Sequence, residues 1–523
     1  YLGILASGKP SPKYFAERPS GFYFPAAIEA FRCLIEDDAK GGRTLANAVE
    51  TSVKLEQARR AKEDKPVKPG EPPHPSTPRY AACNLGLIYD FAFNFMTPEQ
   101  KKLVHDELVL LSSYVDGYGT FNKAEASRSN WATFSYQVWD TVAIEGEPGF
   151  NELKFLGLYR GWRDFFTYSF FKSGAAYEAE GKLLFGMDAI VAFDRIAPKY
   201  NLPLLSAHPL VRAHYGEFTA LSVLPTQDKY AIFDILGSMG GALCTPQDLV
   251  VAHYLYPHDP TIDFVYRTTV GEDYRNLPMP GHSWNNLITD AIFATTHHPE
   301  NTPEKLNLPL SFFCGQRAMM MTRSSWDTNA TFLTMHVRGA SGGHPYRDRN
   351  GIMLSGKGRS WITIPGHGGE VDGRLCNTVL IDGADQSNTT PGRVVDFVDK
   401  PLATFTVGDT KYCWDWVWGN ASKTLTTTNS EGKKVEGNRL TRADIEKENV
   451  EIGQAWKPVE QSFNDFAYTK SDYKLYQEPI KYVADWLAPD GVYNCKIRQV
   501  NTPVLKSFRT AGIVRGPHPY VLV

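Results

Sequence analysis

The spacing of apolar residues divides the chain into two parts. From residue 14 to about 300, apolar side chains recur every three or four positions, which is typical of amphipathic helices. After about residue 310 they alternate with polar side chains, which is typical of strands that bury one face. The pattern therefore predicts a helical first part and a sheet-forming second part.

The best-defined helix follows Thr97, in the stretch TPEQKKLVHDELVLLSSYVDGYG. Thr97 is predicted to cap it, Pro98 takes the first helical position, and Gln100 completes a capping box. Val104 and Leu108 lie on one face of this helix. Similar apolar spacing predicts helices at 25–37, 44–62, 80–95, 131–145, 151–172, 178–197, 210–222 and 283–297.

Proline interrupts the helical part once, and short apolar runs mark the sheet-forming part. The run at 64–78 is predicted as an exposed loop, because proline removes a backbone donor and restricts the residue before it. The polar stretch at 427–452 is expected to be a long loop or a short helical insertion. Stretches rich in β-branched and aromatic residues predict strands within 330–339, 351–366, 377–383, 411–420 and 504–516.

Many medium-length helices without intervening strands favour a helical toroid or solenoid, and the later strands favour an antiparallel sandwich. With 523 residues, the chain is long enough for two domains. The stretch RGPHPYVLV stops within an expected strand. Because an unpaired strand leaves a sheet edge open, further strands are expected beyond residue 523.

Composition narrows the class of partner. Hydrophobic residues make up 42% of the chain, charged residues 22%, and the net charge is −3. This balance argues against a general attraction to nucleic acid or anionic membranes, and no apolar run reaches the roughly 18 residues of a membrane span. The 7 cysteines form no CxxC pair and are expected to be mostly buried apolar residues, with at most one disulfide. The 11 tryptophans suit a protein that stacks planar faces on a ligand.

Candidate chemistry gathers in three polar clusters. The first precedes a predicted helix, the second lies in the stretch SGAAYEAEG, and the third follows a glycine-rich run between two predicted strands. The candidate residues are Arg128, Asn130 and Trp131 in the first cluster, Tyr177 and Glu180 in the second, and His344, Tyr346, Arg347 and Arg349 in the third.

Motifs in a fixed order give these clusters a context. They are SNW at 129–131, SGAAYEAEG at 173–181, RSSWD at 323–327, GGHPYRD at 342–348 and CNTVLIDG at 376–383. Their order resembles that of the heparinase II/III-like polysaccharide lyases and related uronyl epimerases. The resemblance covers most of the chain from about residue 80. It implies an α/α toroid, here 1–305, followed by an antiparallel β-sandwich, here 306–523, in an α+β multidomain protein.

The resemblance also implies a reaction, β-elimination at a uronic acid, and an acidic polysaccharide as the partner. The proton at C5 is weakly acidic, so the sugar carboxylate must be neutralised before a base can remove it. Asn130 would neutralise the carboxylate, and Tyr177 and His344 would act as base and acid. The remaining residues of the clusters would bind substrate, the arginines by holding carboxylate or sulfate in bidentate pairs.

Two departures from the family pattern leave questions open. The relatives place a catalytic Tyr four or five residues after the EG, where this chain has Leu184 and Phe185, so either Tyr177 serves instead or the hydroxyl is missing.

At the family's metal position this chain has Tyr346, Thr363 or Ile364, and Cys376, a poor ligand set for zinc. We therefore predict no metal there and no cofactor, with His367 and Asp372 as the alternative for a structural divalent metal.

Other interpretations of the same residues stay open. Asn130 is also a good helix N-cap, Tyr177 can be an amphipathic core residue, and Arg347 and Arg349 can be solvated surface residues. The leading hypothesis is a secreted or periplasmic polysaccharide lyase, a carbon–oxygen lyase. The alternatives are a uronyl C5-epimerase and a non-catalytic protein that binds acidic glycans. The oligomeric state is left open.

Overall fold

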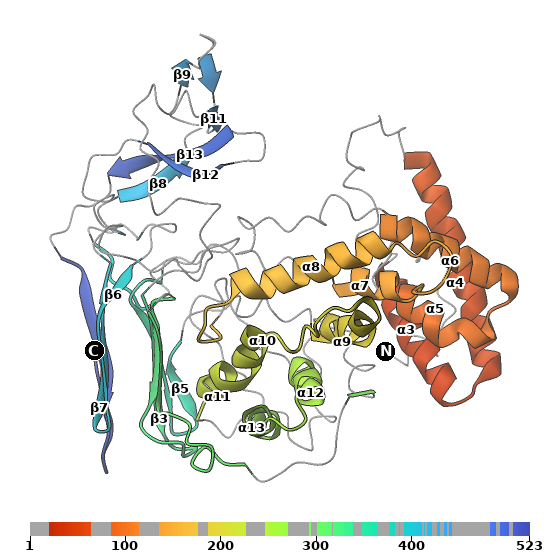
Figure 1. Cartoon of the computed structure of the whole chain (residues 1–523). Helices are drawn as coiled ribbons and strands as arrows, with labels where there is room; N and C mark the ends of the chain where they lie inside the picture. The colour runs from red at the N-terminus through yellow and green to blue at the C-terminus, as the bar shows by residue number, and fades with distance from the viewer. Residues whose placement is uncertain are drawn as a thin grey trace.

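The computed structural model describes the residues 20–63, 85–113, 135–175, 187–225, 246–269, 292–293, 301–315, 317–337, 348–363, 376–381, 386, 392–410, 413, 416–420, 426–428, 434–436, 439–441, 482–487, 492–500 and 506–523. Within these ranges helices come first and antiparallel sheets follow, as the spacing of apolar residues predicts (Figure 1). The boundary between the predicted domains at 305 and 306 stays a prediction.

The α-helices fill the first part of the chain. They are α3 (Ser20–Ile35), α4 (Ala39–Glu63), α5 (Leu85–Ala92), α6 (Pro98–Ser113), α7 (Ser135–Val142), α8 (Glu152–Ser169), α9 (Met187–Ile196), α10 (Pro209–Ala213), α11 (Thr219–Ser222), α12 (Pro246–Leu255) and α13 (Pro260–Thr269). The predicted loop at 64–78 lies outside the described residues, and only 292–293 of the helix expected at 283–297 are described.

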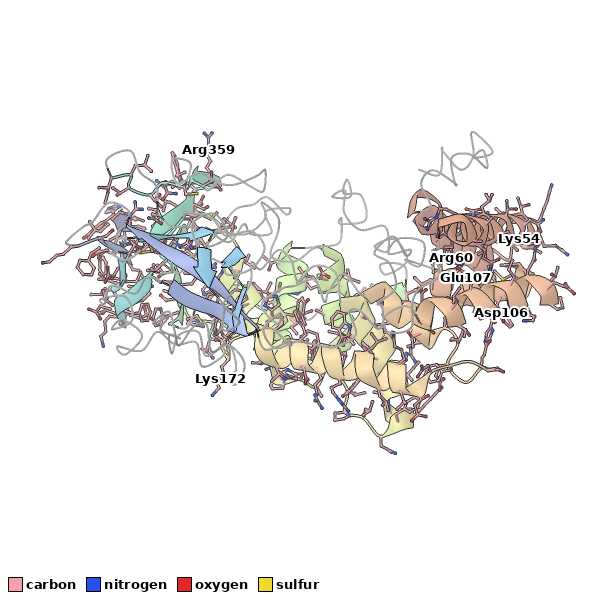
Figure 2. The ribbon with its side chains drawn as sticks, turned by 90° about the horizontal axis from the view of Figure 1, so that it is seen from above. Lys54, Arg60, Asp106, Glu107, Lys172 and Arg359 are labelled. Carbon is pink, nitrogen blue, oxygen red and sulfur yellow. The ribbon has the colours of Figure 1, made fainter. Side chains whose placement is uncertain are left out.

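The capping box of α6 is confirmed. The Thr97 N–H donates to Gln100 Oε1 at 3.0 Å, and the Gln100 N–H donates to Thr97 Oγ1 at 3.3 Å. Val104 and Leu108 are buried against α3, α4 and α5, as their spacing predicts. Arg60 of α4 and Glu107 of α6 form a buried ion pair beside this core (Figure 2). Local sequence therefore determines where α6 begins, and packing determines which face it buries.

The strands follow in short antiparallel pairs. They are β1 (Ser311–Cys314), β2 (Met319–Arg323), β3 (Thr331–His336), β4 (Gly351–Gly356), β5 (Arg359–Ile362), β6 (Arg393–Lys400), β7 (Ala403–Asp409), β8 (Trp416–Asn420), β9 (Thr426–Thr428), β10 (Lys434–Glu436), β11 (Arg439–Thr441), β12 (Tyr482–Leu487), β13 (Val492–Val500), β14 (Phe508–Val514) and β15 (Tyr520–Leu522). One sheet has the order β1-β2-β3-β4-β5 and another β15-β14-β7-β6.

Two predictions were wrong for residues that the structure describes. A loop or short helical insertion was expected at 427–452, but the described residues of that stretch belong to β9, β10 and β11. In the stretch 377–383, the described residues form a turn and then a single bridge at Ile381. The reason is Asn377, whose φ is 48° and whose side chain bonds both the N–H and the carbonyl of Ile352 at 2.9 and 2.8 Å. The Asn377 amide thus bonds the edge of β4, and no strand forms at 377–380.

Strands β1–β4 of the first sheet are buried on both faces, whereas β5 at its edge is largely exposed. Met319 and Met321 of β2 pack into the same cluster as the helical core, whereas Met320 between them packs with β14 of the second sheet. Strand side chains alternate between faces, so consecutive methionines reach opposite neighbours. Figure 1 shows this arrangement, with β3 lying between β7 on one side and α11 on the other.

Arg323, the last residue of β2, joins this sheet to the helices. It is buried, and its Nη2 donates to the carbonyls of Leu221 and Val223 at 2.7 and 2.8 Å, at the C-terminus of α11. Its guanidinium also lies 3.8 Å from the ring centre of Trp326. Burial lowers the pKa of Arg323 to about 9, so the group remains a cation at neutral pH. A cation at the carbonyl end of a helix is favourable, and the planar group suits both contacts.

Replacing Arg323 tests whether this contact holds the two parts together. Arg323→Ala removes a buried cation and leaves two helix-end carbonyls without their donor, so we expect a loss of about 3 kcal/mol in the free energy of unfolding, measured by urea denaturation. The exposed Arg43→Ala is the matched control and should change it by less than about 0.5 kcal/mol. Equal effects of the two substitutions would contradict the role given to Arg323.

Candidate functional site

Most of the predicted site residues lie outside the described residues. This holds for Arg128, Asn130 and Trp131, for Tyr177 and Glu180, and for His344, Tyr346 and Arg347. Arg349 is described, and so are the residues that flank the second and third clusters. The structure therefore shows how the chain is fixed on either side of two of the three clusters.

The second cluster is preceded by a tight turn that a buried histidine holds. The Phe171 N–H donates to the Ala175 carbonyl at 2.8 Å, and Gly174 between them has a φ of +84°. A Cβ at Gly174 would lie 2.5 Å from the Ala213 carbonyl oxygen, so this close approach requires glycine. His214 Nδ1 lies 2.7 Å from the Gly174 carbonyl oxygen and donates to it.

His214 begins a π-helix, His214–Phe218, between α10 and α11. The predicted single helix at 210–222 is therefore interrupted by a wider turn, a feature that occurs often at functional sites. The His214 ring stacks on Phe218 with 5.4 Å between centroids and meets Phe170 edge to face at 5.0 Å. Burial lowers the pKa of His214 to about 4, although its bond to Gly174 opposes the shift. The ring is therefore neutral at physiological pH.

The third cluster is flanked by a buried pair of titratable residues. His336 ends β3, Asp348 follows the segment 338–347, and the two side chains have no exposed surface. His336 Nδ1 lies 3.5 Å from Asp348 Oδ2. The pair thus joins the two described ends of the chain on either side of the segment that carries His344. The Gly351 N–H also donates to the Asp348 carbonyl at 2.7 Å, which tightens the entry into β4.

Burial, the contact between the two residues and two nearby buried arginines together determine the charge state of this pair. Burial and the positive charge of Arg317 lower the pKa of His336 to about 4, with the attraction of Asp348 opposing them. Burial disfavours ionisation of Asp348, but His336, Arg349 and Arg317 outweigh that effect and lower the pKa of the carboxyl. At neutral pH the cluster therefore holds an ionised Asp348, a neutral His336 and two cations.

Hydrogen bonds between side chains and backbone fix the residues after Asp348. The Arg349 N–H donates to Gln386 Oε1 at 3.1 Å, and Gln386 Nε2 donates back to the Arg349 carbonyl at 3.0 Å. Asn350 Nδ2 donates to the Gly408 carbonyl in β7 at 3.1 Å. Arg509 of β14 donates from Nη1 to the Asn350 carbonyl at 2.7 Å. Residues 348–350 are therefore held in place by both sheets.

Arg349 itself is 1% exposed. The interpretation as a solvated surface residue is therefore wrong for Arg349, because its backbone bonds and its neighbours place it inside the sheet assembly. The same burial leaves its side chain almost no surface for a substrate, so the prediction that Arg349 binds substrate directly is not supported. Among the described cysteines, Cys33, Cys314, Cys376 and Cys413 are buried free thiols, as predicted.

The two flanks meet along one contact between helices and sheet. Phe218, the last residue of the π-helix, packs against Phe312 of β1 with 5.2 Å between ring centroids. Ser222 Oγ of α11 donates to Met321 Sδ of β2 at 3.5 Å. Met319, at the other end of β2, is paired with His336 of β3. A continuous set of packed residues thus runs from the turn before Tyr177 to the strand before His344.

Metal ligands are not gathered in the part of the chain that the structure describes, where no group of three or more His, Cys, Asp or Glu side chains could hold an ion. The positions Tyr346, Ile364, His367 and Asp372 lie outside that part. No helix within it is long and apolar enough to cross a membrane.

His214, His336 and Arg317 are the residues that sequence reasoning missed. His336 carried a signal, because it is a polar residue inside the apolar strand sequence TFLTMHV. A buried polar group in a strand needs a partner. A polar residue just before the next strand was the nearest candidate, and Asp348 lies there. His214 and Arg317 carried no comparable signal.

Comparisons with known proteins found similar chains among solved structures alone. No family model matches the chain, and no curated protein matches it. Among solved structures, a mutant of heparan sulfate lyase HepC from Pedobacter heparinus is similar at 12% identity and a TM-score of 0.49, covering 77% of this chain and 59% of that one. A structure of heparinase III is similar at 12% identity and a TM-score of 0.49, covering 77% and 60%. This chain therefore spans about three fifths of the length of the structures it matches.

The state of His214 can be tested through pH. Because its pKa falls from 6.5 to about 4 on folding, the unfolded chain binds more protons between these values, and stability from this group is lost as pH falls through that window. Replacing His214 with Gln keeps a donor for Gly174 and removes the titration. Relative to this variant, wild type should lose about 3 kcal/mol of unfolding free energy between pH 6.5 and 4. A difference that is flat with pH would show that His214 is not a buried neutral imidazole.

The buried His336–Asp348 pair beside the third cluster can be tested separately. Asp348→Asn removes the buried negative charge that faces His336, so we expect a loss of about 3–5 kcal/mol of unfolding free energy and faster amide hydrogen exchange in 338–347. Asp106→Asn is the control, since Asp106 pairs with Lys102 on the exposed face of α6 (Figure 2). Unchanged exchange in 338–347 for Asp348→Asn would mean that the pair does not hold that segment.

Proposed function

We propose that this chain is a polysaccharide lyase that cleaves a uronic-acid-containing polysaccharide by β-elimination. Its helical part would be an α/α toroid and its sheets a β-sandwich. The support comes from the order of the motifs, from SNW at 129–131 to CNTVLIDG at 376–383, on a chain whose described part is helical first and antiparallel afterwards. A secreted or periplasmic location is proposed with it, because large acidic polysaccharides are extracellular substrates.

One observation carries the proposal furthest. The segment 338–347, which contains His344, is bounded by the buried residues His336 and Asp348, in a sheet that packs directly on the helices. A general acid or base must be held within hydrogen-bond reach of its proton, and flanks fixed on rigid strands provide that control. The turn at Gly174 gives Tyr177 an equivalent support on the helical side.

The proposed reaction uses these residues in sequence. Asn130 donates to the uronate carboxylate, so that charge developing at C5 spreads into a neutralised group. The base, Tyr177 or His344, removes the C5 proton, and the released electron pair forms the C4–C5 double bond as the bond from C4 to O4 breaks. The partner residue gives its proton to the departing O4. The products are an unsaturated uronate and a new sugar hydroxyl.

The arginines of the clusters supply the recognition in this proposal. Arg128 and Arg347 would hold carboxylate or sulfate groups in bidentate pairs, and Trp131 would offer a face for a sugar ring. Glu180 and Tyr346 complete the proposed substrate contacts, whereas the buried Arg349 would only support the charge of Asp348 beside them. Heparan-type, chondroitin-type and alginate polymers all carry the required uronate, and the acidic sugar is the feature they share.

The test is turnover of a panel of acidic polysaccharides, followed by the ultraviolet absorbance of the unsaturated uronate. His344→Ala should lower kcat by at least about a hundredfold, because removal of a general acid or base costs 10²–10⁴. Lys172→Ala, on an exposed residue, is the control and should leave kcat unchanged. Full activity in His344→Ala would remove this residue from the mechanism.

Two other outcomes identify the alternatives. Deuterium uptake at C5 without chain cleavage would indicate the epimerase, which returns the proton to the opposite face. Binding of the polymer with neither signal would indicate a glycan-binding protein, an outcome that the missing tyrosine near Phe185 favours.

A further inference from the structure

The hairpin between β4 and β5 turns through two residues with positive φ angles. Lys357 and Gly358 are its two turn residues, with φ angles of 52° and 72°, and Gly356 pairs with Arg359 across them. Two positive φ values define a type I′ turn, the form that matches the twist of paired strands. Lysine is uncommon at such an angle, and conformations of this kind gather at functional sites.

Trp361 lies just beyond this tip on a β-bulge. Ser360 pairs with Ser355 and Ile362 pairs with Leu354, so Trp361 is the extra residue between them. The Trp361 side chain is 61% exposed, and its Nε1–H donates to the Gly356 carbonyl at 3.0 Å. Bulges on edge strands often redirect a side chain, and this hydrogen bond then fixes the indole against the hairpin. The result is a large aromatic face that is exposed and held in place.

Two cations lie at that turn, Lys357 within it and Arg359 directly after it. Lys357 and Arg359 are both exposed, and neither takes part in an ion pair with any other described residue. Arg359 extends away from the ribbon, and Lys172 lies on the opposite side of the same view (Figure 2). Edge strands often carry lysine, arginine or a bulge to prevent pairing with other chains. That explanation covers the cations and the bulge but not the exposed indole.

We propose that Lys357, Arg359 and Trp361 form a second glycan-binding site, separate from the catalytic residues, that takes an acidic sugar unit of the polymer. The apolar face of a sugar ring would stack on the indole, and its carboxylate or sulfate would pair with the cations. The ligand class rests on the proposed function, since it names the same polymer. The hairpin belongs to the sheet that also carries the His336–Asp348 pair, so a polymer held here is tethered close to the enzyme and its effective concentration rises.

The test measures binding of heparin, chondroitin sulfate and alginate oligosaccharides by isothermal titration, with neutral dextran as the comparison. The full chain carries His344→Ala, which leaves the oligosaccharides intact during the measurement. Trp361→Ala should weaken binding of the acidic oligosaccharide that binds best by about tenfold, whereas Trp361→Phe, which keeps a ring to stack on, should weaken it less. The double variant Lys357→Ala with Arg359→Ala should weaken binding and also reduce its dependence on salt.

Lys172→Ala is the matched control for the loss of an exposed cation, and it should leave both affinity and salt dependence unchanged. Each variant is compared at an unchanged thermal unfolding midpoint, and Trp361→Phe replaces Trp361→Ala if the latter unfolds. Unchanged affinity in both tryptophan variants, no binding of any acidic oligosaccharide, or equal binding of dextran would each overturn the proposal. Failure of the lyase proposal is a different result, namely wild type that forms no unsaturated product whether or not it binds.

Discussion

The burial of strands β1–β4 on both faces is the constraint on which the rest of the structure depends. One face packs with the helices through Met319 and Met321, and the other packs with the second sheet through Met320. A sheet without a wet face cannot leave polar groups to solvent, so each one needs an internal partner or a compensating charge. Within these strands Ser311 bonds Thr322, Arg323 bonds the end of α11, and His336 lies beside Asp348.

Two arginines, Arg515 at the second sheet and Arg323 in the first, donate hydrogen bonds to these buried polar groups. Arg515 follows β14 in the second sheet, and its Nη2 donates to the hydroxyls of Ser311, Thr322 and Thr404 at 2.9, 2.8 and 2.7 Å. Its Nε donates to the Arg323 carbonyl at 3.0 Å, and the Arg323 side chain bonds the end of α11. Hydrogen bonds therefore run from the second sheet through the first to the helices. Chemistry shared between helices and sheet needs this rigidity, since small displacements of reacting groups cost large factors in rate.

Local features of the sequence predicted much of this architecture. The capping box at Thr97 specified where α6 begins, because it involves residues only three positions apart. Alternation predicted β3, β4 and β14 for the same reason. Features that depend on distant partners were not predictable. The Asn377 side chain bonds the Ile352 backbone, and the strand expected there does not form. At the π-helix, His214 stacks on Phe218 and donates to the Gly174 carbonyl, which lies 40 residues away in the chain.

The candidate site shows the same division. The motif GGHPYRD pointed to the segment that carries His344. The sequence did not reveal that His336 and Asp348 meet at its two ends, because residues 337–347 lie between them and burial contributes to their charge state. Most of the predicted catalytic residues lie outside the described part, so their roles rest on the motif order.

In the proposed mechanism one acidic sugar is held between the Asn130 amide and the His344 imidazole. The most direct test is a crystal structure of the full chain with a bound uronate oligosaccharide, using His344→Asn to slow turnover. We expect a single uronate whose carboxylate accepts a hydrogen bond from Asn130 and whose C5 faces both Tyr177 and residue 344. A sugar bound elsewhere, with Asn130 and residue 344 on separate surfaces, would contradict it.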